Sequence, residues 1–231
     1  MSFPRYPNYK PSGLEWLGEV PEHWQVIGLG MRYTVELGKM LDSKRVTGAF
    51  LRPYLRNTDV QWGVIRVDDL PTMDFEPEEV ERFLLRYGDL LVCEGGEVGR
   101  CAIWRDEQPG ACYQKALHRV RPLQPSLDVP EFLYWCLCAA AVAGTFTADE
   151  SKATIAHLPA ESFRKYRFPF PGAAEQRAIA AFLDATTSRL DALVTEAERA
   201  IALLQQRRAA LIFAAVTGQI DVRRLASEVT A

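Results

Sequence analysis

Residues that could carry out catalysis are sparse in this sequence. Asp149 and Glu150 lie just before Lys152, and two carboxylates beside a lysine could serve a metal-dependent nuclease if a further carboxylate joined them. Such a triplet often arises by chance. The chain has three histidines, His23, His118 and His157. They are far apart and lack the H-E-x-x-H spacing of a zinc site. The sequence therefore predicts no catalytic residue and no bound metal.

Short motifs for cofactors and nucleophiles are missing as well. There is no G-x-x-x-x-G-K-[ST] phosphate loop, no G-x-S-x-G elbow, and no N-P-P-F or D-P-P-Y signature of adenine methyltransferases. Gly28-x-Gly30 lacks the third glycine of a dinucleotide turn, and Gly95-Gly96-x-x-Gly99 precedes an expected strand rather than a helix. Both patterns predict tight turns. The chain is expected to bind a partner and leave the chemistry to other proteins.

The cysteines and the apolar runs indicate a cytoplasmic protein. Five cysteines, at positions 93, 101, 112, 136 and 138, include no C-x-x-C pair, so we expect reduced and mostly buried thiols. No run of about 18 apolar residues could span a membrane. The polar, proline-rich start MSFPRYPNYKPSG has no apolar signal core.

Charge is informative once it is localised. The net charge of −3 argues against a general nucleic-acid coat protein. Residues 68–81 hold seven carboxylates, and we expect them to form a solvated loop that faces away from any nucleic acid. Without that stretch, residues 1–172 carry 20 basic against 16 acidic side chains, with basic segments at 39–56 and 100–121. These segments suit phosphate and base-edge contacts, although a solvated charged face is the commoner meaning of such runs.

Two parts of the chain differ in their elements, which predicts an α+β fold. Residues 1–172 should form a mixed, strand-rich domain, and residues 173–231 a long helical region. Short β-like runs occupy 53–60, 63–67, 89–93, 99–104 and 117–120, and an apolar-aromatic segment at 162–170 suggests a closing strand. Residues 130–143 predict a helix that begins with Pro130 near its first position.

The second part contains about 44 residues without glycine or proline, ending before Gly218. A seven-residue register places apolar side chains on one seam, which is typical of a coiled coil. The seam residues expected to mediate dimerisation are Leu183, Leu190, Val194, Ala197, Ile201, Leu204 and Leu211. The alternative is an amphipathic helix packed on its own domain, but about 45 Å of helix exceeds the width of such a domain.

The orientation of the pairing follows from Arg208, which occupies a seam position. A parallel dimer would bring two Arg208 side chains together beside an apolar seam, which is unfavourable. An antiparallel pair crossing near 197–201 would instead place Arg208 near the carboxylates of Asp184, Asp191 and Glu196. We therefore expect an antiparallel homodimer.

Several segments together resemble the DNA-specificity (S) subunit of type I restriction–modification systems. They are YPNYKPSGLEWLGEVPEHW (6–24), GKMLDSKRVTGAFLRPYLRNTDVQWGVI (38–65), GDLLVCEGGEVGRCAIW (88–104), ACYQKALHRVRP (111–122), FPFPGAAEQRAIAAFLD (168–184) and VTGQID (216–221). The usual member has two recognition domains and two helical regions, whereas this chain has one of each. The resemblance thus implies a half-size form that pairs with itself or with a separately encoded second half.

The resemblance also implies that this chain has no catalysis and no cofactor of its own. S-adenosylmethionine, ATP and Mg would belong to the partners, namely modification subunits that methylate adenine and a restriction subunit that cleaves. Two readers separated by paired helices would recognise a bipartite target in double-stranded DNA. Two alternatives stay open: a small nuclease using Asp149, Glu150 and Lys152, and a protein-binding scaffold.

Polar and basic residues in the turn-rich stretches are the expected DNA contacts. They are Lys39, Ser43, Lys44, Arg45, Asn57, Arg100, Gln114, Lys115, Ser151, Lys152 and Thr154.

Overall fold

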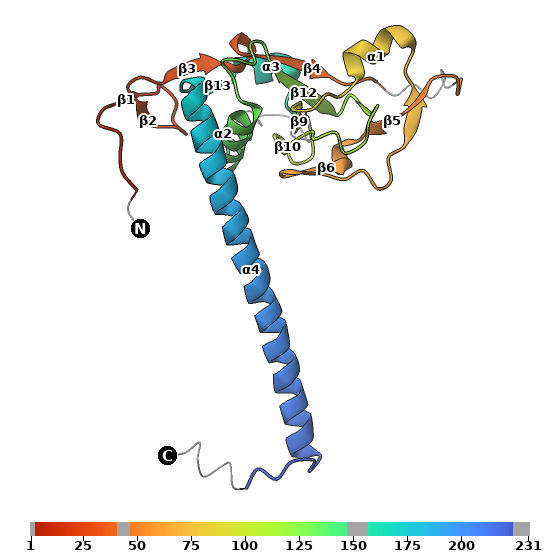
Figure 1. The fold of residues 1–231 in the computed structure, drawn as a ribbon, viewed down its shortest axis with the longest axis vertical. Coiled ribbons are helices and arrows are strands. Elements are labelled where there is room, and N and C mark those ends of the chain that lie inside the picture. Colours follow the sequence, from red (N-terminus) through yellow and green to blue (C-terminus); the bar gives the residue numbers. More distant parts are fainter. Residues whose placement is uncertain (1–2, 41–46, 147–156, 224–231) are drawn as a thin grey trace. The chain divides into compact units, whose positions relative to one another are not determined.

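The computed structural model describes residues 3–40, 47–146 and 157–223. The chain divides into two compact units, Met1–Ala180 and Ala181–Ala231. The boundary lies within a helix, so the first two turns of that helix belong to the first unit. The mixed, strand-rich first unit and the long helix confirm the predicted α+β class (Figure 1).

The first unit is built on an antiparallel sheet of four strands in the order β10-β9-β12-β4. These strands are β4 (Tyr33–Leu37), β9 (Leu90–Cys93), β10 (Cys101–Ile103) and β12 (Leu117–Pro122). All four residues of β9 are buried, as expected for an apolar strand in the middle of a sheet. In register, Val120 lies opposite Leu90 and Val35, so one apolar row crosses three strands.

Smaller sheets surround this one. A three-stranded sheet has the order β11-β5-β8, and three two-stranded sheets pair β1 with β2, β13 with β3, and β6 with β7. Their strands are β1 (Tyr9–Pro11), β2 (Glu19–Pro21), β3 (Gln25–Gly28), β5 (Leu51–Leu55), β6 (Val60–Gln61), β7 (Val64–Ile65), β8 (Thr72–Asp74), β11 (Cys112–Tyr113) and β13 (Arg167–Phe170). The short 3-10 turns are η1 (Leu29–Met31) and η3 (Asn57–Asp59).

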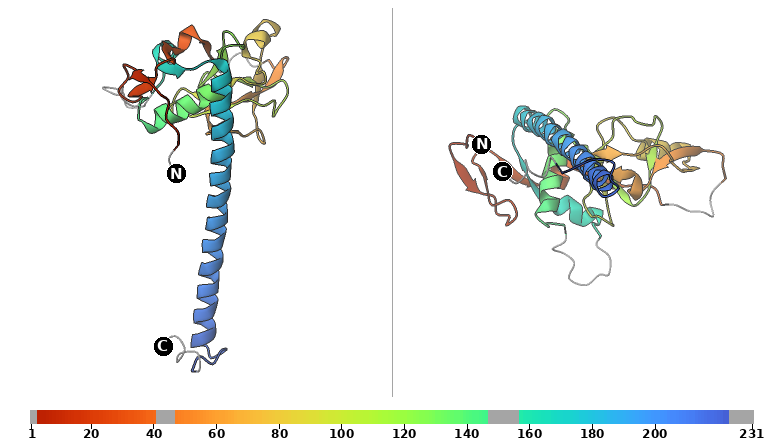
Figure 2. Two further views of the ribbon diagram at one scale, coloured as in Figure 1. Left: turned by 60° about the vertical axis from the view of Figure 1, so that its left-hand side comes forward. Right: turned by 90° about the horizontal axis from the view of Figure 1, so that it is seen from below.

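The described part of the first unit also contains the helices α1 (Pro77–Phe83), α2 (Pro130–Val142) and α3 (Ala160–Lys165). Helix α2 begins with Pro130 at its first position, as predicted, and buries Phe132, Leu133 and Leu137. These side chains join the apolar core together with Val92 and Val120 of the sheet. Figure 2 shows α2 and the start of α4 (Ala173–Val216) side by side in two further orientations.

Two of the predicted strands include residues that form turns or helix in the structure. The expected strand 53–60 ends at Leu55 in β5, because Arg56 and Asp59 then form a capped 3-10 turn, η3. The expected strand 162–170 begins only at Arg167, because residues 160–165 form α3, which buries Phe163 in the core. In both places a local turn interrupts an apolar run that by itself reads as continuous strand.

The second unit consists mainly of the distal part of α4. The helix runs unbroken from Ala173 to Val216, a length of about 66 Å at 1.5 Å per residue. It ends as predicted at Gly218, which has φ of 73°. The amide of Gly218 donates to Ala215 O at 3.3 Å, and that of Gln219 donates to Ala214 O at 2.8 Å, which is a Schellman motif.

Candidate nucleic-acid interface

Four segments that are distant in sequence meet at one end of the central sheet. We call this region, residues 38–40, 57–58, 94–100 and 113–117, the loop cluster. The amide of Lys39 donates to Tyr113 O at 3.0 Å, and the amide of Lys115 donates to Lys39 O at 2.9 Å. The backbones approach so closely that a Cβ atom on Gly38 would lie 2.4 Å from the carbonyl of Gln114. Only glycine fits at this position.

Asn57 links the other segments of the loop cluster. Its Nδ2 donates to Gly95 O at 3.0 Å and to Ala116 O at 3.4 Å. Its Oδ1 accepts a hydrogen bond of 2.9 Å from Nη2 of Arg100, which also donates to Asn57 O at 3.1 Å. Nη1 of Arg100 lies 3.3 Å from Oε2 of Glu97. Asn57 and Arg100 therefore bind each other and hold the 94–100 loop in place.

Lys39 is bound within the protein. Its ammonium group donates to Asp74 O at 2.8 Å and to Oε2 of Glu79 at 2.5 Å. Glu79 belongs to the acidic stretch 68–81, which contains β8 and α1. The expectation that this stretch is a solvated loop is wrong: Asp74 is buried, and its carboxylate accepts amide hydrogen bonds from Thr47, Gly48 and Phe50 at 2.6–2.9 Å.

Those backbone hydrogen bonds also decide the charge of the Asp74 carboxylate. The bonds from Phe50 and Gly48 are the largest influences and lower the pKa of Asp74 below its usual value, although burial opposes them. The carboxylate therefore stays ionised and fixes the point at which residues 47–50 enter the fold.

Two further predicted DNA contacts have no internal partner of this kind. Lys115 is exposed, and within the described parts of the chain no carboxylate forms an ion pair with it. Gln114 is half-buried beside it. Its backbone amide donates to Leu55 O at 3.1 Å and its carbonyl accepts from the amide of Leu117 at 3.0 Å, and no hydrogen bond of its side chain is found among the described residues. The side-chain amide of Gln114 and the ammonium of Lys115 thus lie on the loop cluster beside two other exposed polar residues, Thr58 and Glu97.

The remaining predicted contacts lie outside the described residues. Ser43, Lys44 and Arg45 fall in 41–46, and Ser151, Lys152 and Thr154 fall in 147–156, together with Asp149 and Glu150 of the nuclease alternative. The described ends of these two stretches lie at or near the loop cluster. Met40 follows Lys39, Phe146 lies against Gly99, and His157 pairs with Gly95. Of the eleven predicted contacts, the structure brings together the five it describes: Lys39, Asn57, Arg100, Gln114 and Lys115.

The described chain offers no obvious centre for metal chemistry. Across residues 3–40, 47–146 and 157–223, no group of three or more His, Cys, Asp or Glu side chains could hold a metal ion. His118 is buried, and its Nε2 lies 2.7 Å from Leu158 O. No described helix is long and apolar enough to cross a membrane.

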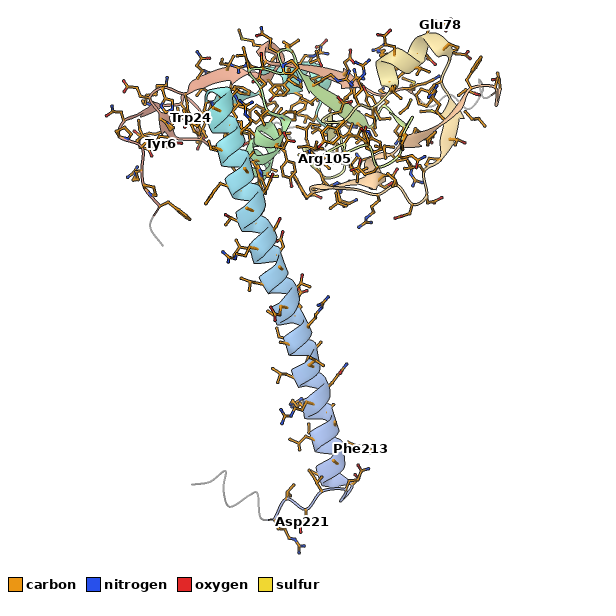
Figure 3. All side chains as sticks on the ribbon, in the orientation of Figure 1. Tyr6, Trp24, Glu78, Arg105, Phe213 and Asp221 are labelled. Carbon is orange, nitrogen blue, oxygen red and sulfur yellow. The ribbon has the colours of Figure 1, made fainter. Side chains whose placement is uncertain are left out.

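Most seam residues of the distal helix are exposed among the described residues. Leu190, Val194, Ile201, Leu204 and Leu211 are each more than half exposed, Ala197 is exposed, and Leu183 is half-buried. Figure 3 shows the described side chains of this part of α4 projecting around the helix. Glu175 and Gln176, at the start of the same helix, each have several hydrogen-bond partners and are absent from the predicted site residues. The sequence signal that could have indicated them is their position just after Pro171-Gly172, which places both in the first turn of the helix.

Comparison with known proteins then identifies the family. The type I restriction modification DNA specificity domain, as a family model, matches residues 21–202. This chain belongs to that family. The resemblance drawn from the sequence is confirmed, and a family of DNA specificity domains agrees with a recognition component rather than an enzyme.

Solved structures agree on the fold. A chain from a structure of the complex assembly and conformational transition of the type I R-M system has 21% identity and a TM-score of 0.65, and the match covers 85% of this chain and 46% of that chain. The HsdS subunit from Thermoanaerobacter tengcongensis has 19% identity and a TM-score of 0.54, with 80% and 41% covered. The specificity domain thus spans less than half the length of these relatives. No curated protein matches.

Proposed function

We propose that this chain is the non-catalytic DNA sequence-recognition subunit of a type I restriction–modification complex. It directs adenine methylation and cleavage, carried out by partner subunits, to a bipartite target. The observation that carries the proposal is the family match over 21–202, which includes both the strand-rich unit and much of the long helix.

The proposed DNA-reading face is the loop cluster. Lys115 supplies an exposed cation for a phosphate, and Gln114 supplies an amide that can donate to and accept from a base edge. The other proposed DNA contacts, which lie outside the described residues, are Ser43, Lys44, Arg45, Ser151, Lys152 and Thr154. Asn57 and Arg100 act here by holding the loops, because Oδ1 of Asn57 already accepts from Nη2 of Arg100, and Nδ2 of Asn57 already donates to Gly95 O and Ala116 O.

The proposed partners are double-stranded DNA, modification subunits and a restriction subunit in the cytoplasm. S-adenosylmethionine, ATP and Mg would be bound by those partners, and this chain would hold no cofactor. The chain would pair with a second copy, or with a separately encoded half, along the seam of α4. The exposed leucines of the seam support this, because such an apolar strip on a helix is normally covered by another helix.

A charge-reversal experiment tests the DNA face. Modified adenines in the source genome give the two half-sites and the gap, and a duplex carrying them serves as the probe. We expect Lys115→Glu to weaken retention of this probe by roughly tenfold at physiological salt and to lower the salt slope of binding by about one, because one phosphate contact is lost.

The matched control is Lys165→Glu. Lys165 is also exposed, but it is the last residue of α3. The carbonyl of the next residue, Tyr166, accepts a hydrogen bond from the amide of Leu29. Leu29 precedes β4, whereas Gly38 of the loop cluster follows it. We expect this variant to bind as the unmodified chain does. Equal loss in both variants, or no loss in Lys115→Glu, would remove the loop cluster from the DNA interface. Cutting of DNA by the lone chain with Mg²⁺ would replace the proposal with the nuclease alternative.

A further inference from the structure

The start of α4 is attached to the first unit by two adjacent polar residues. Glu175 lies in the first turn of the helix and accepts three hydrogen bonds from the N-terminal segment. Tyr6 Oη donates to Oε1 at 2.7 Å, Trp24 Nε1 donates to Oε1 at 3.1 Å, and His23 Nε2 donates to Oε2 at 3.0 Å. Figure 3 shows Tyr6 and Trp24 beside this turn. One carboxylate thus gathers three side chains that are more than 150 residues away in sequence.

The electrostatics of this site favour the bonded state. Burial alone would raise the pKa of Glu175, but the hydrogen bonds from Tyr6, His23 and Trp24 outweigh it and lower that pKa. The same carboxylate raises the pKa of Tyr6 to about 12, chiefly through its hydrogen bond. Trp24 also packs on Phe132 of α2 with ring centroids 6.3 Å apart, so the site is connected to the core.

Gln176 attaches the helix in a second direction. It is buried, and its Oε1 accepts the amide of Val129, the residue before α2, at 2.9 Å. Its Nε2 donates to Leu127 O at 3.1 Å and to Pro171 O at 2.9 Å. Every polar atom of this buried amide therefore has a partner, and these partners belong to the segment that leads into α2 and to the residue before Gly172.

Exposure increases along α4 beyond these turns. Ala180 is the last buried residue of the helix in the described chain, Leu183, Thr186 and Thr187 are half-buried, and residues 188–213 are all exposed. A helix attached at its base acts as a lever. From residue 181 to the middle of the remaining helix is about 27 Å, so a swing of about 10° moves the attached domain by about 5 Å. This exceeds the rise of one base pair, about 3.4 Å.

We infer that Glu175 and Gln176 are positioning residues that set the length of the unread gap between the two half-sites. The inference rests on the proposed function, because it requires two recognition domains separated by paired helices. Glu175 and Gln176 touch no base. They act by fixing the direction in which α4 leaves the domain that reads the DNA.

A gap series tests this role. The complex with its methylase partner is offered duplexes that carry both half-sites with gaps from three base pairs shorter to three longer than the natural one. We expect Glu175→Gln to reduce the preference for the natural gap over its neighbours by about tenfold, because hydrogen bonds to a charged acceptor are lost. Tyr6→Phe, which removes one donor, should act in the same direction with a smaller effect. The half-site sequence preferred at the natural gap should stay the same in both variants.

The matched control is Glu161→Gln, the same substitution at another first-turn glutamate, which is exposed on α3. It should leave the gap preference unchanged. A variant that merely destabilised the fold would lower retention at every gap equally. That outcome for Glu175→Gln, or an unchanged gap preference in a folded protein, overturns the inference.

A second measurement separates this inference from the proposed function. Nitroxide amino acids are incorporated at Ser126 and Gln206, both exposed, and distances are measured in the full chain without DNA and with unlabelled chain in excess. Glu175→Gln should broaden the distance distribution. The unmodified chain could retain duplexes of every gap length equally while Glu175→Gln still broadens the distance distribution. That result would refute the bipartite recognition of DNA but support the role of Glu175 in anchoring α4. An unchanged distribution refutes the anchoring itself.

Discussion

Self-pairing of the distal helix makes the sharpest quantitative prediction. Leu190 is 54% exposed and Leu204 is 63% exposed, and both lie on the seam. Full burial of a leucine side chain contributes about 1.5–3 kcal/mol. Covering the exposed parts of these two leucines in both chains therefore contributes about 3.5–7 kcal/mol. Replacing both with aspartate removes this contribution and adds the cost of desolvating carboxylates, so the dissociation constant should rise by roughly three to five orders of magnitude.

Sedimentation velocity over a range of chain concentrations measures this change directly. The double variant Leu190→Asp with Leu204→Asp should sediment as a monomer and should no longer retain a probe with two half-sites. The single variants Leu204→Asp and Leu203→Asp form a matched pair. Leu203 is 65% exposed, but it lies 100° around the helix from Leu204 and off the seam.

The control variant Leu203→Asp shows whether a loss of self-association is specific to the seam. Dissociation by Leu204→Asp but not by Leu203→Asp supports pairing along the seam. Equal dissociation by both would refute the assigned register. A clean monomer for the unmodified chain, alone and with its methylase partner, would refute self-pairing and favour a separately encoded second half.

Three further predictions concern the first unit, and urea unfolding checks each of them. Asp89→Asn should lower the free energy of unfolding by about 2–4 kcal/mol, because buried Asp89 pairs with Arg121 at 2.6 Å and the variant leaves that cation without a carboxylate. Burial lowers the pKa of His118 from 6.5 to about 4. The unfolded chain therefore takes up the proton first, and stability should fall by about 3 kcal/mol as the pH drops from 6.5 to 4. His118→Gln should remove this part of the pH dependence, and its persistence in that variant would assign it to another group. Gly38→Ala should cost roughly 2–4 kcal/mol, since its Cβ would meet the Gln114 carbonyl at 2.4 Å, and full stability in this variant would contradict that close approach.

The long helix and the central strands could be predicted from the sequence because their signals are local. Forty-four residues without glycine or proline predict a helix whatever packs on it, and Leu90–Cys93 is an apolar run of strand length. The helix α3 was missed because residues 160–165 are only one and a half turns long and merge into an apolar-aromatic run. Its anchor is Phe163, which is buried by contacts that no local pattern shows.

The candidate site could be predicted only in outline. The sequence points to loops that meet in space, since the five described candidates lie in one cluster. It does not reveal that Lys39 is bound to Glu79, 40 residues away, or that Asn57 and Arg100 bond to each other. A basic residue in a turn-rich stretch has the same local appearance whether it faces solvent or a carboxylate from another element. The partner is set by tertiary packing.

The proposed DNA-reading loop cluster and the proposed anchor of α4 lie toward the two ends of one strand, β12. β12 begins at Leu117, directly after Ala116, whose carbonyl Asn57 binds in the loop cluster. It ends at Pro122, about 17 Å further along, and the chain then continues to Leu127 and Val129, which bind Gln176. Because the anchor of α4 shares no side-chain contact with the loop cluster among the described residues, loop residues can change the bases that are read without changing the direction of the helix. Substitutions at Gln114 should therefore alter the half-site and leave the gap unchanged, whereas substitutions at Glu175 should do the reverse. A loop variant that shifted the preferred gap would show that the two tasks are coupled through β12.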